Sequence, residues 1–501
     1  MNQPKVRDRV AIVGGGPAGL TAALALRDLG YKKIQLFEKA PDVGGKCLTI
    51  ELLPGVTYEL GASSMNGRYE NVFKLLDYHE LSRRAVDSSR FIDADHPDRD
   101  PTRGPWEDQL PQNVTALISR LLRRPGLIPR DLRLLSPGFG EMTKAELGNF
   151  SKTLREELED GNLMQLETVV RTVVSGIGYG YIDEVPAAYL LKYLALWTPV
   201  IEKAQLGPRT YELLQVGFQG LFKRVAADLD RGRSPANRIV HTSHEVTSIV
   251  RPKDKQEGVI KVHCATDSGE SVFECDHLIL ACPLDDALRF FLKDDEPSPT
   301  ERSFERLQSY TFHSILTDVT GFPAVRWAFL MHNHFSIKSG LPVLSARRHI
   351  DAERVVFYVL DKDAPAEIKT RPGPRYAHIK GSELTKLASG IASNDQILSK
   401  YVKETLDRLS ADLHDRMNLS NLKPLEHVIW KYFPHYSEQD VKAGLPLDLE
   451  GEQGKRNTYY VGELLDFSSI ECVMRYSRHL VATKFSPVRP KRGAFLSSVL
   501  R

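Results

Sequence analysis

A short run near the N-terminus, GGGPAG at residues 14–19, constrains the fold more than any other part of the sequence. It follows the apolar run Val10–Val13, which predicts a buried parallel strand. Apolar residues at helical spacing then extend from Pro17 to Leu29, and a second apolar run, Ile34–Phe37, follows. This order predicts that the chain opens with a βαβ unit, and therefore an α/β fold built on a parallel sheet.

The glycines of this run have the spacing G-x-G-x-x-G, directly between strand and helix. Gly14 permits the tight turn, Gly16 lets backbone approach a pyrophosphate, and Gly19 lets the helix pack closely on the strand. The helix N-terminus offers N–H groups and partial positive charge to phosphates. Glu38 lies 19 residues beyond Gly19, where a carboxylate holds ribose hydroxyls. Together these features predict a Rossmann-type dinucleotide site rather than an ordinary glycine turn.

Composition limits the class of protein. The chain has 501 residues, and 67 basic against 65 acidic residues leave a formal charge of +2. This near-neutral balance argues against nucleic acid as a partner, and 42% hydrophobic content argues against intrinsic disorder. Two or three domains are expected at this length. No oligomeric state is predicted.

The five cysteines are scattered, and no CxxC pair occurs among them. This argues against a disulfide scaffold, a zinc ribbon or a dithiol redox motif, so we expect no metal site. A reducing compartment fits this usage, and the N-terminal residues show no apolar signal core. No apolar run approaches the ~20 residues that a membrane helix needs. These features predict a cytoplasmic protein without a transmembrane segment.

Two further motifs indicate which dinucleotide is bound. GGK at 44–46 follows Glu38 closely, and YELGA at 58–62 comes next. Near the other end lies YYVGE at 459–463. These motifs are similar to those of large FAD enzymes of the flavin amine oxidase and phytoene desaturase type. The resemblance implies non-covalently bound FAD, with the late acid, Glu463, at its ribityl-pyrophosphate part.

The segment SSIE at 468–471 fits a capping box, which would start a helix over roughly 470–484. That helix would aim N–H groups at the flavin pyrimidine edge, where negative charge gathers on reduction. In this class of enzyme the strand at Val246 offers backbone contacts to adenine. The predicted cofactor-binding residues are Gly14, Gly16, Pro17, Ala18, Gly19, Glu38, Lys39, Gly44, Gly45, Lys46, Gly61, Ala62, Val246, Gly462, Glu463, Ser469 and Ile470.

No second G-x-G-x-x-G follows a strand in this sequence. A flavoprotein that uses a nicotinamide cofactor normally carries a second such domain. We therefore expect hydride to enter and leave with the substrate itself, or with oxygen.

Three segments resemble a narrower family, the FAD-dependent double-bond isomerases of polyunsaturated (polyenoic) fatty acids. They are GGKC at 44–47 together with YELGA at 58–62, the run GYGYIDEVPAAYLLKYL at 178–194, and the run from Tyr432 to Glu463. The family resemblance implies that flavin N5 takes a hydride from a doubly allylic carbon and returns it to another carbon of the same chain. Double bonds thereby shift into conjugation without net redox change. No acid–base dyad is required, which agrees with the lack of a catalytic Cys/His or Ser/His signature.

The substrate residues are less sharply indicated. The resemblance implies an arginine that holds the fatty acid carboxylate, and Arg90 is the candidate, with Arg83 and Arg84 as competitors. An ordinary surface arginine is the alternative. Phe91, Tyr179 and Tyr181 are candidates for the acyl tunnel, or for aromatic core packing.

Residues 119–135 are rich in arginine and leucine. They fit either a solvated helical surface or a basic amphipathic patch that touches a membrane or an anionic acyl substrate.

We expect a discontinuous FAD-binding domain made of residues 8–86, 236–290 and 450–484. A helical cap and substrate region would span 87–235, a mixed α+β substrate domain 291–449, and a basic tail 485–501.

Two other functions fit the same fold. One is an FAD-dependent oxidase or dehydrogenase acting on an amine or alkene. The other is a non-enzymatic lipid-binding protein of the GDP-dissociation-inhibitor type, which would hold no flavin.

Overall fold

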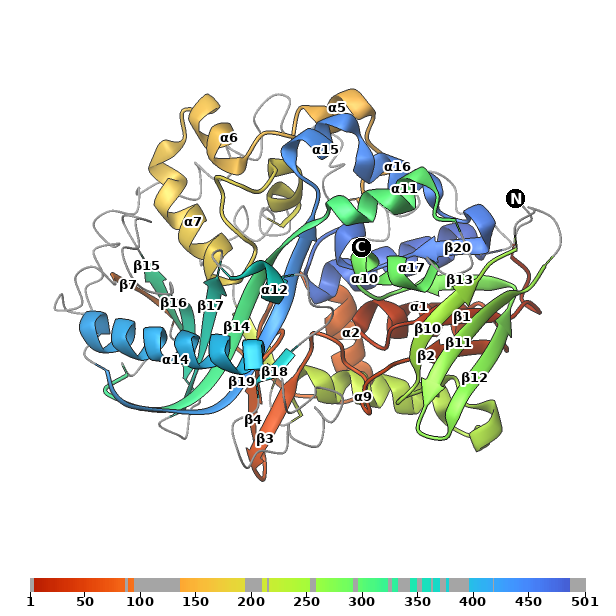
Figure 1. Cartoon of the computed structure of the whole chain (residues 1–501), viewed down its shortest axis with the longest axis horizontal. Coiled ribbons are helices and arrows are strands. Elements are labelled where there is room, and N and C mark those ends of the chain that lie inside the picture. Colours follow the sequence, from red (N-terminus) through yellow and green to blue (C-terminus); the bar gives the residue numbers. More distant parts are fainter. Residues whose placement is uncertain are drawn as a thin grey trace.

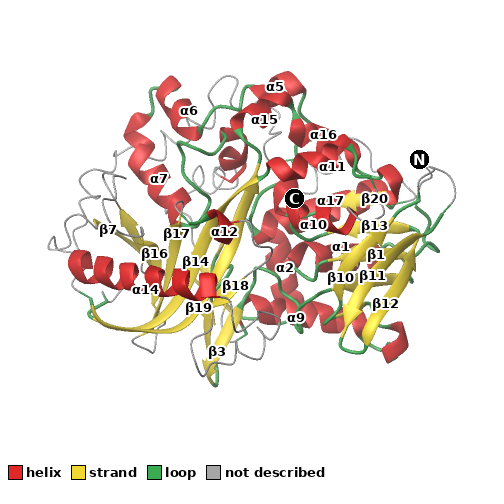
Figure 2. Cartoon of the chain, viewed as in Figure 1, coloured by secondary structure: helices red, strands yellow, loops and turns green. Residues whose placement is uncertain are grey.

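The computed structural model describes residues 4–85, 89–93, 136–193, 210–213, 216–252, 258–291, 296–322, 327–331, 343–348, 354–361, 364–369, 375–377, 396–417 and 419–486. A parallel sheet and a larger, mostly antiparallel sheet lie side by side, with helices packed around both (Figure 1). Figure 2 shows the strands in two groups, with helices between the groups and around the larger sheet. Among the described helices, none is long and apolar enough to cross a bilayer.

The parallel sheet has five strands in the order β20-β13-β1-β2-β9. Its centre is β1 (Val10–Val13), flanked by β2 (Ile34–Phe37) and β13 (His277–Leu280). The edges are β20 (Thr458–Tyr460) and β9 (Val240–His241). Every residue of β1 and β13 is buried, as expected for parallel strands covered on both faces. Strands from three distant parts of the chain therefore share one sheet.

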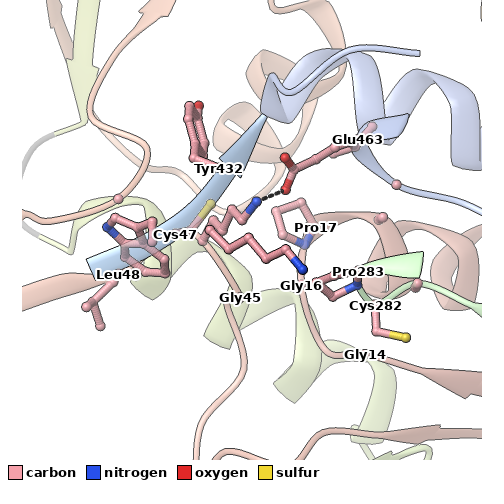
Figure 3. A pocket seen from close by; sticks show the side chains of 18 of the residues that line it. Gly14, Gly16, Pro17, Gly45, Cys47, Leu48, Cys282, Pro283, Tyr432 and Glu463 are labelled. Atoms are coloured by element: carbon pink, nitrogen blue, oxygen red, sulfur yellow. Dashed lines mark ion pairs between the residues drawn. The ribbon is translucent and has the colours of Figure 1, made fainter. Parts of the chain in front are cut away.

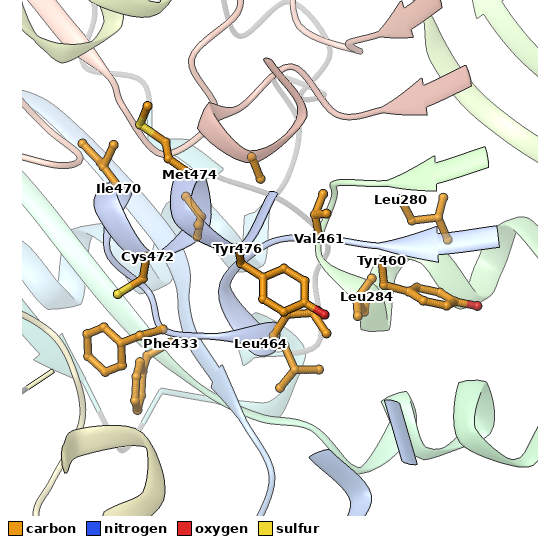
Figure 4. Packing of buried hydrophobic residues seen from close by; sticks show 14 of the residues in the cluster. Leu280, Leu284, Phe433, Tyr460, Val461, Leu464, Ile470, Cys472, Met474 and Tyr476 are labelled. Atoms are coloured by element: carbon orange, nitrogen blue, oxygen red, sulfur yellow. The ribbon is translucent and has the colours of Figure 1, made fainter. Parts of the chain in front are cut away.

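Helix α1 (Pro17–Asp28) follows β1 and packs against α17 (Ile470–Lys484) and α9 (Gly217–Asp230). Its proline lies in the first turn, where a missing N–H costs no hydrogen bond. Figure 4 shows the apolar packing around α17, where Ile470, Cys472 and Met474 lie near the end of β20. This packing fixes both helix N-termini relative to the sheet.

The larger sheet has seven strands in the order β18-β19-β14-β17-β16-β15-β7. Only the pair β15 and β7 is parallel. The strands are β7 (Ser89–Asp93), β14 (Gln308–Thr320), β15 (Trp327–Met331), β16 (Val343–Arg348), β17 (Arg354–Asp361), β18 (Arg375–Ala377) and β19 (Ser420–His435).

Helix α14 (Gln396–Met417) covers one face of this sheet (Figure 1). Its Leu409 and Leu413 pack on Ile315, Ala346 and Phe357 in a separate apolar cluster. Helix α7 (Glu167–Gly176) packs against β15, β16 and β17. The remaining strands are β3 (Thr49–Leu53), β4 (Val56–Glu59), β5 (Met65–Asn66), β6 (Arg83–Ala85), β8 (Thr210–Leu213), β10 (Glu245–Val250), β11 (Ile260–Thr266) and β12 (Gly269–Cys275). The remaining α-helices are α2 (Glu70–Tyr78), α5 (Lys144–Gly148), α6 (Leu154–Asp160), α10 (Leu284–Phe291), α11 (Pro299–Arg302), α12 (Ala366–Lys369), α15 (Glu438–Ala443) and α16 (Leu445–Glu452).

The predicted fold class is confirmed: the chain opens with the expected βαβ unit, and a mixed region accompanies the parallel sheet. Two strands, β7 and β8, lie within 87–235, the segment of the predicted helical cap and substrate region. Both are short, and their partners come from distant segments, so local sequence does not reveal them. The domain boundaries stay a prediction, and residues 119–135 lie outside the described residues.

Candidate cofactor and substrate cavity

A cavity of about 1150 Å³ lies where the two sheets meet. It is larger than the roughly 300–1,000 Å³ typical of small-molecule pockets. One half is lined by the β1–α1 loop, the segment 37–48 and the segment 461–470, and the other half by aromatic side chains, several of them from the larger sheet. Figure 3 shows the first half, with Gly14, Gly16, Pro17 and Gly45 on one side and Glu463 facing them. The volume suits a dinucleotide together with a second molecule.

The β1–α1 loop has the geometry of a phosphate cradle. Gly14 has φ +115°, and a Cβ there would lie 2.7 Å from the carbonyl oxygen of Ala281. A Cβ on Gly16 would meet only the Cα of Gly45, at 3.7 Å, so this backbone is open toward the cavity. The N-cap residue of α1 is Gly16, which has no side chain to cap this helix. The N–H groups of the first turn and their partial positive charge therefore suit a pyrophosphate.

Glu38 lines the cavity at the end of β2. Its carboxylate accepts hydrogen bonds from the backbone N–H of Gly15 at 2.7 Å and of Ala40 at 2.9 Å. Burial raises the pKa of Glu38, and these two N–H groups oppose that rise. A carboxylate has about four lone-pair sites, so Glu38 can accept ribose hydroxyls besides backbone N–H groups.

Replacing Glu38 with alanine should weaken FAD binding by about 1.5–3 kcal/mol, the usual contribution of hydrogen bonds to a charged group. Glu38→Gln keeps one acceptor and should lose less. Apoprotein prepared by acid release of FAD would be titrated with the cofactor. An unchanged affinity of the alanine variant would show that Glu38 does not bind the ribose.

The opposite wall carries an ion pair between distant segments. Lys46 Nζ lies 2.6 Å from Glu463 Oε1, as the dashed line in Figure 3 marks. The same ammonium lies 5.0 Å from the ring centre of Tyr432, a cation–π distance. Ser468 donates to the other Glu463 oxygen at 2.8 Å. These contacts hold the Glu463 carboxylate at the cavity wall.

The predicted capping box at 468–471 is wrong. The N-cap of α17 is Ser469, whose side chain accepts from Cys472 N at 3.1 Å. Glu471 instead accepts from the backbone N–H groups of Asn71 and Val72, in the first turn of α2. The glutamate thus caps a helix 400 residues away in sequence, a partner that local spacing does not reveal. The N-terminus of α17 still faces the cavity, since Ser469 and Ile470 line it.

The second half of the cavity is aromatic. Tyr179 is buried, with its ring 4.5 Å from that of Phe467 and stacked 6.0 Å from that of Tyr432. Burial raises the pKa of both tyrosines, so their hydroxyls stay protonated at neutral pH. Other rings of this wall are Tyr69, Tyr193, Phe312, Tyr358 and Trp430. Such a wall suits an apolar, electron-rich chain and excludes water.

Most of the predicted residues meet at this one cavity. Those that line it are Gly14, Gly16, Pro17, Ala18, Glu38, Lys39, Gly45, Lys46, Gly61, Ala62, Tyr179, Val246, Gly462, Glu463, Ser469 and Ile470. Three others are not among the lining residues. Gly19 packs on the carbonyl of Gly14, Gly44 lies against Cys47 and Gln219, and Tyr181 packs on Tyr310. Their roles in binding stay predictions.

Two of the arginine candidates, Arg83 and Arg84, lie apart from the described cavity wall. Arg83 is bound to Asp77 at 2.8 Å, and neither Arg83 nor Arg84 is among the lining residues. Arg90 and Phe91 belong to β7 at the edge of the larger sheet, and their side chains are outside the described part of the structure. Their roles stay predictions.

Several lining residues were missed by sequence reasoning. Lys431 forms ion pairs with Asp285 and Asp286 of α10, and burial lowers its pKa to about 8. Trp430 donates to the carbonyl of Leu60 at 2.8 Å. Both precede the motif that starts at Tyr432. Because they are neighbours on one strand, alternation would place only one of them on the cavity face, so no local signal marks both.

Comparison with known proteins agrees with this geometry. The family model of the flavin containing amine oxidoreductases matches residues 17–327, more than half of the chain. The chain therefore belongs to this family. Membership implies a flavin-dependent enzyme, and the predicted flavin amine oxidase superfamily is confirmed.

Solved structures share the fold across nearly the whole chain. The CLA-producing fatty acid isomerase from P. acnes has a TM-score of 0.71 at 23% identity, covering 96% of this chain and 99% of that one. Putrescine oxidase bound to putrescine has a TM-score of 0.60 at 13% identity, covering 95% and 98%. A zeta-carotene desaturase from Zea mays is 37% identical over 73 residues, which is 15% of this chain and only 12% of that relative.

Proposed function

We propose that this protein is an FAD-dependent isomerase that shifts double bonds of a polyunsaturated fatty acid into conjugation by internal hydride transfer. The observation that carries the proposal is the aromatic half of the cavity, which continues directly from the dinucleotide half. The shared fold with a CLA-producing fatty acid isomerase supports the choice of substrate class.

The residues that line the two halves of the cavity would have different roles in this reaction. The β1–α1 loop and the N-terminus of α1 would hold the FAD pyrophosphate, Glu38 the ribose, and the Lys46–Glu463 pair the region nearer the flavin ring. Bound FAD would supply the centre that takes up and returns the hydride. Tyr179 and Tyr432 would hold the acyl chain in an extended, dry path. Their protonated hydroxyls make them poor bases, which suits a reaction without acid–base steps.

We propose that FAD is held without a covalent bond. Cys47 is the cysteine beside the glycine pair, and burial raises its thiol pKa well above the ordinary value. A thiol held in its neutral form is a poor nucleophile toward a flavin ring. A cytoplasmic location and a place in lipid metabolism stay predictions.

The rival function is an oxidase or dehydrogenase, which the fold of putrescine oxidase favours. Anaerobic incubation with a panel of polyunsaturated acids separates the two. We expect ultraviolet absorbance from conjugated double bonds, without added acceptor or NAD(P)H. Turnover that needs oxygen and releases peroxide would favour the oxidase. A colourless purified protein would instead favour a lipid-binding protein without flavin.

A further inference from the structure

The cavity wall carries more acidic than basic side chains. Among the described residues that line it, seven are Asp or Glu and four are Lys or Arg. A pyrophosphate is itself negative, and like charges placed close together weaken binding. Binding of an anionic cofactor therefore depends on where the positive charges of the wall lie.

Two of the acids lie close to the glycine loop. Asp285 and Asp286 belong to the first turn of α10, where the helix dipole favours carboxylates, and both line the cavity. The segment before this helix contacts the loop, since a Cβ on Gly14 would lie 3.2 Å from the backbone nitrogen of Cys282. Figure 3 shows Cys282 and Pro283 beside the loop. The two carboxylates are therefore on the side of the cavity where the pyrophosphate is proposed to bind.

Lys431 of β19 faces both of these acids. Its ammonium forms an ion pair with Asp285 and lies 3.8 Å from Asp286 Oδ1. The side chain of Lys431 is 18% exposed, and those of Asp285 and Asp286 are 16% and 12% exposed. Charges with so little contact with water are weakly screened. Removal of this one positive charge would therefore make the wall beside the glycine loop strongly negative.

Two other cations of the wall are placed differently. Burial and the nearby charge of Lys46 lower the pKa of Lys431 to about 8, which still leaves its ammonium charged at pH 7. Lys46 itself is paired with Glu463 at 2.6 Å. Arg289 of α10 lies 3.5 Å from Glu245, but these two side chains are 42% and 51% exposed, so water screens them.

The contact of Lys431 with α10 also joins the two sheets. Lys431 belongs to the larger sheet, whereas α10 follows β13 of the parallel sheet. A purely structural role would be a strut that holds the cavity walls together. The two roles differ in one respect: removal of Asp285 breaks a strut, but it also removes a negative charge from the wall.

We propose that Lys431 is a positioning residue for the cofactor, whose positive charge offsets Asp285 and Asp286 and so allows the glycine loop to bind the FAD pyrophosphate. FAD as the bound dinucleotide is part of the proposed function, on which this proposal rests. Lys431 acts through the two carboxylates, because complementary charge across a binding site decides which ligands it accepts.

The test measures FAD affinity from the fluorescence of the FAD released when the holoprotein is diluted. Lys431→Met keeps most of the side-chain length without its charge. It should bind FAD about 10–100-fold more weakly at low salt, the effect of one unit charge on another across about 6–12 Å at a partly buried site. Because salt screens charges, this loss should shrink as potassium chloride is added. Lys431→Arg keeps the charge and should bind FAD like the native protein.

Lys223→Met is the matched control. It removes a lysine that lies 2.8 Å from Asp42, another residue of the cavity wall, but these side chains are 45% and 41% exposed. Exposed pairs contribute little, so its FAD affinity should hardly change.

Asp285→Ala separates the charge from the strut. It removes an acid together with the contact to Lys431, so we expect FAD to bind at least as tightly as in the native protein. The double variant Lys431→Met/Asp285→Ala should recover most of the affinity that Lys431→Met loses. A strut predicts the opposite, with FAD bound more weakly in Asp285→Ala and no recovery in the double variant.

The outcomes are distinct. Native affinity in Lys431→Met at low salt would overturn the proposal while leaving the proposed function standing. A loss that salt does not reduce, or that Asp285→Ala shares, would overturn it in favour of a strut. If circular dichroism shows that Lys431→Met does not fold, weaker FAD binding by Asp285→Ala than by the native protein would still overturn it. A native protein that is colourless and binds no added FAD would contradict the proposed function itself.

Discussion

Replacing Asp466 with asparagine should lower the free energy of unfolding by about 3–5 kcal/mol, the usual cost of breaking a buried ion pair. Asp466 joins two cations: Lys192 Nζ lies 2.8 Å from its Oδ1, and Arg475 Nη2 lies 2.7 Å from its Oδ2. The side chains of Lys192 and Asp466 are fully buried. An asparagine amide would turn N–H groups toward one of the two cations and leave a buried positive charge uncompensated. The loop that carries Glu463 to the cavity would lose its support.

Urea unfolding of the FAD-bound protein, followed by circular dichroism, measures this change. The matched control is Asp160→Asn, which breaks the exposed pair of Lys152 and Asp160 at 2.7 Å. Exposed pairs contribute little, so the control should unfold almost like the native protein. Equal midpoints for the two variants would contradict the role given to the buried cluster.

The second large effect is expected at Gly61, where two backbone segments meet in the cavity wall. A Cβ at Gly61 would lie 1.9 Å from the carbonyl oxygen of Lys46. That contact is with backbone, so no side-chain rotation relieves it. Gly61→Ala must therefore push the Lys46 segment away from Glu463. We expect the free energy of unfolding to fall by about 3 kcal/mol, at the upper end of overpacking costs. FAD should also bind roughly 100-fold more weakly.

Gly67→Ala is the matched control, because a Cβ at Gly67 meets none of the described atoms within 4 Å. This variant should retain FAD like the native protein. Cofactor titration of the two apoproteins gives the comparison. Native affinity in Gly61→Ala would show that the Gly61–Lys46 contact does not shape the cofactor site.

The dinucleotide half of the cavity could be predicted from sequence because its signals are local. The glycine spacing, the strand before it and Glu38 after the second strand lie within about thirty residues. The chemistry of a βαβ turn depends on backbone, so glycine positions reveal it. The late residues Gly462 and Glu463 could be placed because their short motif precedes a helix start.

The substrate half could not be predicted in the same way. Phe312, Tyr358 and Trp430 line one cavity only because β14, β17 and β19 lie in one sheet, and sequence does not give the order of strands. Glu471 caps α2 rather than its own helix for the same reason, because its partner comes from a distant segment. Long-range partners decide these positions, whereas spacing reports only neighbours along the chain.

The central claim is isomerisation by internal hydride transfer, and a label decides it most directly. A polyunsaturated acid deuterated at the doubly allylic carbon would be incubated with the enzyme in ordinary water, without oxygen or NAD(P)H. Mass spectrometry and NMR of the product locate the deuterium. The account predicts that the product keeps the label at a new carbon of the same molecule, with double bonds in conjugation. Loss of the label to water, or stoichiometric peroxide when oxygen is admitted, would contradict it.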